Sequence, residues 1–167
     1  MISISPVSPH EWPTYRDLRL RALRDSPDAF GSTFESESQR TDENWAARIA
    51  AAAADGNDRA FFAFHGDAAC GLVWCKLSAA EPGAADLYQM WVDPASRGLG
   101  AGSALLKAAL AWAASAAVHQ VRLGVTLADT PAMRLYQAHG FQPVGAPEPL
   151  REGSSLLSQA MECQLSI

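Results

Sequence analysis

The sequence contains few cysteines, fewer basic than acidic residues and no long apolar run. Its three cysteines, Cys70, Cys75 and Cys163, stand at no spacing typical of a metal site or a disulfide framework. We therefore expect no bound metal and a reduced, cytoplasmic location. The formal net charge of -5 argues against nucleic acid as a partner, because phosphate binding needs a positive surface.

Membrane contact is also not expected. The longest apolar stretch, residues 108–118, is alanine-rich and far too short to cross a bilayer. No secretory h-region or lipidation motif is visible, so the sequence predicts no membrane partner. The 167 residues are 49% hydrophobic, which provides enough apolar surface for one sizeable core. We expect a single domain over residues 1–167.

Apolar periodicity and turn residues predict a mixed α/β domain with about seven strands and about four helices. The expected helices cover residues 10–25, 42–54, 100–117 and 131–139. The expected strands cover residues 2–5, 59–65, 69–77, 86–92, 121–126, 141–144 and 156–165. Residues 29–39 are predicted to form a loop anchored by Phe30 and Phe34. Cys70 and Cys75 lie an odd number of positions apart in one strand, which predicts opposite faces for their side chains.

A glycine-rich turn joins the expected strand 86–92 to the helix that follows it. The turn consists of Arg97, Gly98, Leu99, Gly100, Ala101 and Gly102. A strand, a glycine turn and a helix N-terminus together present unpaired backbone N–H groups and partial positive charge to an anion. Glycine lets the anion approach the amides, and Arg97 either supplies a charge or braces the turn. The alternative is a tight packing turn without a ligand.

Two other phosphate-binding motifs do not fit this turn. A dinucleotide fingerprint needs a glycine where the sequence has Ser103, and the acidic residue it needs further on is missing. A P-loop needs Gly-Lys-Ser/Thr after its spacers, and the sequence has none. The surroundings instead resemble motif A of the GNAT family of N-acetyltransferases: residues 88–94 read Tyr-Gln-Met-Trp-Val-Asp-Pro and precede the turn. Further along the chain, motif B of that family is matched by Ala132, Leu135, Tyr136, Gly140 and Phe141.

The order of expected elements also matches, so the resemblance covers essentially the whole chain and implies the GNAT fold. By this resemblance, acetyl-CoA enters where strands 86–92 and 121–126 separate. The residues implied in cofactor binding are Met90, Trp91, Val92, Arg97, Gly98, Leu99, Gly100, Ala101, Gly102, Ser103 and Asp129. The family often has asparagine at the position of Asp129, for which helix capping is the alternative role. Gly124 stands where ribosomal-protein N-terminal acetyltransferases have a glutamate base, which weakens the resemblance to that subgroup.

Tyr136 matches the family tyrosine that protonates the departing thiolate. A phenol suits this role, because its ordinary pKa is close to that of a thiol. The alternative is a core tyrosine, since Ala132, Leu135 and His139 share its helical spacing.

An amine acceptor also needs a base, because its ammonium form cannot attack. The sequence offers Glu35, Glu37, Asp86 and His65 without distinguishing them, and a water chain is a further alternative. The aromatic residues Trp91, Phe30 and Phe34 line an acceptor pocket or anchor the core.

The resemblance implies transfer of an acetyl group from acetyl-CoA to a primary amine of a small molecule or peptide, by direct attack in a ternary complex. One alternative is a catalytically idle acyl-CoA-binding sensor or partner module. Another is an acyltransferase that uses a different acyl group or a hydroxyl acceptor. The helix at 100–117 carries only one charged side chain, Lys107, which predicts cover on more than one side and makes a homodimer plausible.

Overall fold

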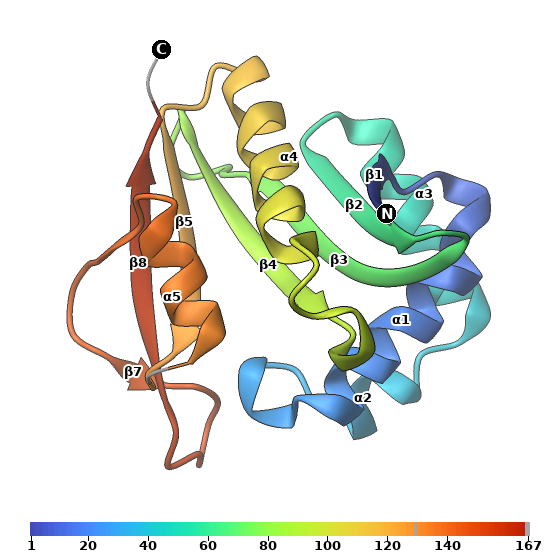
Figure 1. Ribbon diagram of the computed structural model, residues 1–167, viewed down its shortest axis with the longest axis horizontal. Coiled ribbons are helices and arrows are strands. Elements are labelled where there is room, and N and C mark those ends of the chain that lie inside the picture. Colours follow the sequence, from blue (N-terminus) through green and yellow to red (C-terminus); the bar gives the residue numbers. More distant parts are fainter. Residues whose placement is uncertain (129, 166–167) are drawn as a thin grey trace.

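The computed structural model describes residues 1–128 and 130–165, and Figure 1 shows them arranged around one twisted sheet. Within these residues the sheet has 8 strands. They are β1 (Ile2–Pro6), β2 (Asp58–His65), β3 (Ala68–Leu77), β4 (Ala84–Val92), β5 (Gln120–Thr126), β6 (Gln142–Pro143), β7 (Glu148–Pro149) and β8 (Leu157–Gln164). Their spatial order is β1-β2-β3-β4-β5-β8-β6, and β7 also pairs with β8. Only the β4–β5 pair is parallel among the described strands, so the predicted mixed sheet is confirmed.

Helices cover both faces of the sheet. The α-helices are α1 (Trp12–Asp25), α2 (Phe34–Ser38), α3 (Asp42–Asp55), α4 (Ala101–Ser115) and α5 (Pro131–Ala138). Helix α4 lies across β1 to β4 on one face, with α5 beside it on β5, while α1 and α3 cover the other face. Among the described residues, none of these helices has both the length and the apolar character needed to cross a membrane.

Alternating side chains on β2 build the two cores. Phe61 and Ala63 point into the core beneath α4, whereas Ala60 and Phe62 join the core beneath α1 and α3. This period of two is the ordinary consequence of a pleated strand buried on both faces. The weakly charged helix predicted at 100–117 therefore has most of its cover from the sheet itself.

Within the described residues, one short α-helix and one short strand were not predicted from the sequence, and three single-turn 3-10 helices lie in connections: Pro9–Glu11, Pro27–Ala29 and Pro94–Ser96. Helix α2 lies within the expected loop 29–39 and is capped by Thr33, whose hydroxyl accepts a hydrogen bond from the Ser36 N–H at 3.2 Å. Strand β7 has two residues and lies in the connection before β8. Elements this short contain too few residues to show a periodic apolar pattern.

Strands β4 and β5 pair only at their beginnings. Residues 84–86 of β4 pair with residues 120–122 of β5, and no later pair is formed. The two strands then diverge, and Figure 1 shows β4 and β5 separating toward the turn that precedes α4. The second half of β4 therefore has one edge without a strand partner, which is where the resemblance led us to expect the cofactor.

A β-bulge lies in this unpaired half of β4. On the β3 side, Leu72 pairs with Trp91 and Trp74 pairs with Tyr88, so two residues of β4 oppose one residue of β3. One of these two, Gln89, has φ of 62°, a backbone region that L-amino acids other than glycine seldom adopt. Bulges of this kind redirect the strand and are frequent beside functional sites.

Candidate functional site

The glycine turn before α4 forms an open cradle of backbone amides. Gly98 and Gly100 have φ of 83° and 85°, and a Cβ placed on either would meet nothing within 4 Å. The N-terminal N–H groups of α4 have no intrahelical acceptor, and the first α-helical bond at this end runs from the Ala104 N–H to the Gly100 carbonyl at 3.0 Å. The turn therefore has the left-handed glycines, the free space and the free donors that an anion needs.

The side chain of Arg97 braces this turn. Its Nε donates to the Val92 carbonyl at 2.9 Å, and one Nη donates to the Asp25 carboxylate at 3.2 Å. The indole Nε1 of Trp91 donates to the same carboxylate oxygen at 3.2 Å. Asp25 thus ties the end of α1 to the end of β4. Of the two roles that the sequence left open for Arg97, these contacts favour bracing.

Gly102 has a different role from the two glycines of the cradle. A Cβ at this position would lie 3.2 Å from a methyl group of Leu135, so its absence lets α5 approach α4 closely. The next residue, Ser103, continues this contact, because its hydroxyl lies 3.2 Å from Nε2 of His139. Ala101 is buried and Leu99 is exposed. Close packing between α4 and α5 therefore accounts for glycine at position 102. This is the packing role that the sequence left open as an alternative for the whole turn.

The backbone at the end of β4 alternates between its two edges. The Asp93 N–H donates to the Cys70 carbonyl of β3 at 2.7 Å, so the peptide groups of Val92 face the opposite edge, toward the gap. Trp91 pairs with Leu72 of β3, and Met90 precedes it inside the bulge, where the regular alternation is interrupted. The side chains of Met90 and Val92 pack beneath α4, whereas Trp91 belongs to the core beneath α1.

Tyr136 lies on α5, in the same core as α4. It is 7% exposed, and its ring meets the ring of Phe141 edge to face with centroids 5.8 Å apart. Burial raises the pKa of the Tyr136 phenol above its usual range, so the group stays protonated at neutral pH. The packing fits a core tyrosine, and burial makes the phenol a weaker acid, so the general-acid role stays a prediction. Asp129, the other residue expected near α5, lies outside the described residues.

A cleft of about 420 Å³ lies on the opposite face of the sheet, between α3 and strands β3 and β4. Its lining residues are Arg48, Ala51, Ala52, Asp55, Asp58, Trp74, Lys76, Tyr88 and Gln89. The last two belong to the part of β4 that has no partner on the β5 side. The cleft and the glycine turn thus approach the same half of β4 from opposite faces of the sheet.

Comparison of the chain with known protein families identifies the family to which it belongs. The family model described as acetyltransferase (GNAT) family matches residues 12–141, which is most of the chain. The chain belongs to the GNAT family. The predicted family is therefore confirmed, and the match includes both the glycine turn and Tyr136.

Curated relatives of this GNAT chain include mycothiol acetyltransferases. The protein from Thermobispora bispora is 35% identical over an alignment of 130 residues, which covers 74% of this chain and 40% of that protein. The protein from Acidothermus cellulolyticus is 29% identical over 141 residues and is likewise covered over 40% of its length. The chain therefore spans less than half the length of these relatives.

Solved structures confirm the GNAT fold. The acetyltransferase of the GNAT family from Streptococcus pneumoniae superposes with a TM-score of 0.81 at 23% identity, covering 99% of this chain and 100% of that one. PaiA N-acetyltransferase from Thermoplasma acidophilum, solved in complex with coenzyme A, gives a TM-score of 0.78 at 18% identity, with 99% of each chain covered. At these identities the likeness concerns the fold.

The three carboxylates and one imidazole considered as bases lie apart from one another in this GNAT chain. His65 ends β2 and pairs with Ile2 of the edge strand β1, away from β4. Asp86 lies on β4 and forms an ion pair with Nε of Arg122 at 3.3 Å. Glu35 is exposed on α2. None of these three residues lines the cleft.

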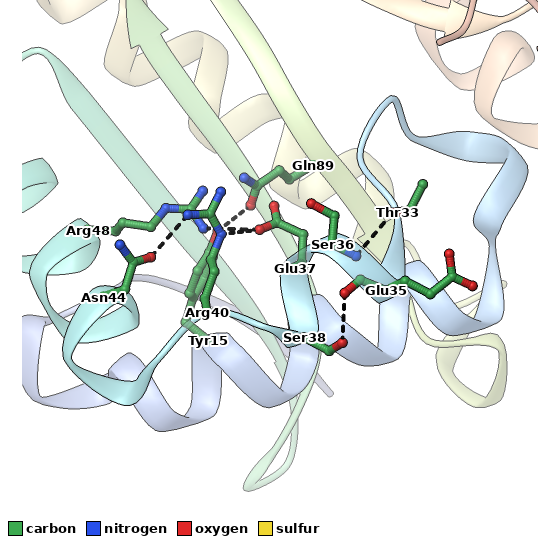
Figure 2. A network of polar contacts seen from close by, with 10 residues as sticks. All are labelled: Tyr15, Thr33, Glu35, Ser36, Glu37, Ser38, Arg40, Asn44, Arg48 and Gln89. Atoms are coloured by element: carbon green, nitrogen blue, oxygen red, sulfur yellow. Dashed lines mark hydrogen bonds and ion pairs between the residues drawn. The ribbon is translucent and has the colours of Figure 1, made fainter. Parts of the chain in front are cut away.

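Glu37, the fourth of these residues, lies in a buried polar network, which Figure 2 shows from close by. Its carboxylate is 5% exposed and forms ion pairs with Arg40 and Arg48. Beside it, the Tyr15 hydroxyl donates to Oε1 of Gln89 at 2.6 Å. The network therefore connects α1, α2 and α3 to the bulge of β4.

Of the two roles left open for the three aromatic residues, their packing favours anchoring the core. Phe30, Phe34 and Trp91 all pack in the cluster beneath α1 and α3. Sequence analysis missed Arg19, which is 3% exposed and lies over the Phe30 ring at 4.7 Å. The missed signal was its position one turn after Tyr15 and one turn before Leu23, on the buried stripe of α1.

Proposed function

We propose that this GNAT chain transfers an acetyl group from acetyl-CoA to an amine of a small molecule or peptide. One observation carries the proposal: the end of β4 has an unpaired edge, and this edge leads directly into the open glycine cradle at the start of α4. An extended pantetheine arm can pair with such an edge while its pyrophosphate lies on the cradle amides. Gly98 and Gly100 hold the pyrophosphate in this proposal.

The peptide groups of Met90 and Val92 would contact the donor. The Val92 carbonyl already accepts from Arg97, so the free donors at this edge are N–H groups. An N–H aimed at the thioester oxygen stabilises the negative charge that develops there as the amine attacks. Holding the amine and the thioester in contact is the other large contribution to the rate.

The chemical steps balance with groups of this chain and solvent. The neutral amine nitrogen attacks the thioester carbon, the C–S bond breaks, and the CoA thiolate takes a proton from the Tyr136 phenol. The phenolate then regains a proton from solvent, and the amine gives up its extra proton to a base. A water chain through the cleft supplies that base in this proposal, because none of the other candidates lines the cleft.

The test is thiol release from acetyl-CoA with a panel of polyamines, amino acids, aminoglycosides and peptides. We expect turnover with at least one class of amine, and the acetylated product by mass spectrometry. Tight CoA binding without thiol release across the panel would favour the idle acyl-CoA-binding module. Release that is faster with a longer acyl-CoA, or with an alcohol as acceptor, would support the other alternative.

A further inference from the structure

The polar network beside β4 contains more positive charge than it neutralises. Three arginines, Arg19, Arg40 and Arg48, surround one carboxylate, Glu37, and Figure 2 shows the side chains of Arg40 and Arg48 converging beside it and Gln89. Arg40 bonds Glu37 directly, whereas the nearest Arg48 nitrogen is 3.7 Å from the same oxygen, too far for a hydrogen bond. The group therefore retains two positive charges in a chain whose net charge is -5.

Several donors of this cluster have no acceptor. Nε and Nη1 of Arg19 and Nη1 of Arg48 are buried without a hydrogen-bond partner among the described residues. Burial lowers the pKa of Arg19, and the nearby positive charge of Arg48 lowers it further, while Glu37 acts in the opposite direction. Leaving charged donors unpaired in the interior is costly, so a site of this kind favours a second anion.

The cleft provides access to this charge. Arg48 forms part of its wall together with Gln89 and Lys76. Within the part of the chain that the structure describes, no carboxylate lies within ion-pair distance of Lys76. Two acids also line the wall: Asp58 accepts from the Trp74 indole at 2.8 Å, and Asp55 accepts from the Asn57 N–H at 2.8 Å. Both donors are neutral, so the two carboxylates keep their charge. The cations Arg19, Arg40, Arg48 and Lys76 still exceed the anions Glu37, Asp55 and Asp58 by one charge.

We infer that the acceptor amine carries a carboxylate, which Arg48 and Lys76 bind in this cleft while the amine lies at the bulge of β4. This inference rests on the proposed function, since it assigns the substrate class of the same site. The Arg48 guanidinium can bind a carboxylate through two parallel hydrogen bonds. The buried Arg19 guanidinium interacts electrostatically with Arg48 and adds to the positive potential there. An amino acid or a peptide with a free carboxyl end has this chemistry.

Paired substrates test the inference directly. We expect kcat/KM for an amino acid to exceed that for its carboxamide by about tenfold, with the difference in KM, because one charge-assisted contact is lost. Arg48→Gln should remove most of this preference, so that the kcat/KM values for the amino acid and its carboxamide become nearly equal. Arg59→Gln is the matched control, since Arg59 lies against Trp112 beneath α4 and should leave both rates unchanged.

A binding measurement separates this inference from the proposed function. Calorimetry with CoA present should detect binding of the amino acid, and the Lys76→Gln variant should bind it much more weakly. Because Lys76 is exposed, this variant should fold even if Arg48→Gln does not. Equal affinity for amino acid and carboxamide, or none for either, overturns the inference even if other amines release thiol. A preference for an aminoalkyl phosphate over the amino acid also overturns it. Selective amino-acid binding without any thiol release would support the site and refute the transferase.

Discussion

At the scale of single residues, Tyr136 is where packing and chemistry can be separated. Tyr136→Phe keeps the ring against Phe141 and removes only the hydroxyl that is proposed to protonate the thiolate. We expect kcat to fall by about 100-fold, in the range of general-acid effects, with acetyl-CoA affinity nearly retained. Stopped-flow thiol release measures the rate and calorimetry measures the affinity. An unchanged rate would leave Tyr136 as a core residue.

Tyr15 acts on the site through its neighbour Gln89. Its hydroxyl donates to Oε1 of Gln89 at 2.6 Å and so helps hold a residue whose φ is 62°. Tyr15→Phe should lower the free energy of unfolding by about 1 kcal/mol and lower kcat with little change in CoA affinity. Urea unfolding and steady-state kinetics check both effects.

The matched variant for this position is Gln89→Gly, because glycine adopts the left-handed backbone without strain. It should retain the bulge without help from Tyr15, so adding Tyr15→Phe to it should have little further effect on kcat. Additive losses in the double variant would contradict a shared role at the bulge.

Which residues could be predicted depended on how far apart their partners lie in the sequence. The turn at 97–102 and Tyr136 belong to local motifs, so the sequence alone was enough to propose them as site residues. Arg19 and Arg48 depend on contacts between α1, α2, α3 and β4, which no local pattern reports. The prediction that Cys70 and Cys75 lie on opposite faces of their strand is wrong, because both side chains lie in the same core. A β-bulge causes this: Ala63 pairs with Gly71 and Phe64 with Ala69, so Cys70 is an extra residue in the strand.

At the scale of elements, the start of a helix was predictable where a side-chain cap precedes a long apolar stripe. Thr41 accepts from the Asn44 N–H at 3.1 Å at the start of α3, and Thr130 accepts from the Met133 N–H at 3.2 Å at the start of α5. Both threonines are recognisable in the sequence as capping residues. Helix α2 has the same cap in Thr33, but its five residues lack a long apolar stripe.

The start of α4 gives a prediction that separates ligand binding from packing. Gly100→Val places a side chain in the open cradle, so we expect CoA affinity to fall at least about tenfold and stability by about 1–2 kcal/mol through backbone strain. Gly102→Val should mainly destabilise the protein, because its side chain would press on Leu135. Calorimetry with CoA and thermal unfolding distinguish the two.

Gly56→Val is the control for strain alone. Gly56 follows α3 with φ of 72°, and a Cβ added there would meet nothing within 4 Å, as at Gly100, but the residue lies far from the cradle in the sequence. This variant should lose stability similarly and keep CoA affinity. If Gly100→Val also keeps its affinity, the cradle does not bind the pyrophosphate.

At the scale of the whole molecule, the proposed donor side and the proposed acceptor side were not equally predictable. The donor side consists of one strand, one turn and one helix that follow each other in sequence, so a motif encodes it. The acceptor side combines the cleft of about 420 Å³ with a network drawn from three helices and a strand. Its composition depends on the packing of the α1–α3 layer, which a single sequence does not specify locally.

The buried thiol and phenol groups predict how the free energy of unfolding changes at alkaline pH. Burial raises the pKa of Cys75 from an ordinary 9.0 to about 12, and it also raises the pKa of Tyr15 and of Tyr136. The folded chain keeps these protons while the unfolded chain releases them, so the unfolded state binds fewer protons and the free energy of unfolding falls as pH rises. For Cys75 this loss begins near pH 9 and continues to about pH 12.

Urea unfolding at about pH 8 and about pH 10.5 measures this slope. Cys75→Ala removes one of the three groups and should make the decline shallower, although the smaller side chain lowers stability at both values. Since the comparison uses the difference between the two pH values, the packing loss cancels. An equal decline in Cys75→Ala and the parent chain would mean that the thiol ionises as readily in the folded protein as in the unfolded one. That result would contradict the raised pKa expected for a thiol buried in the core beneath α4.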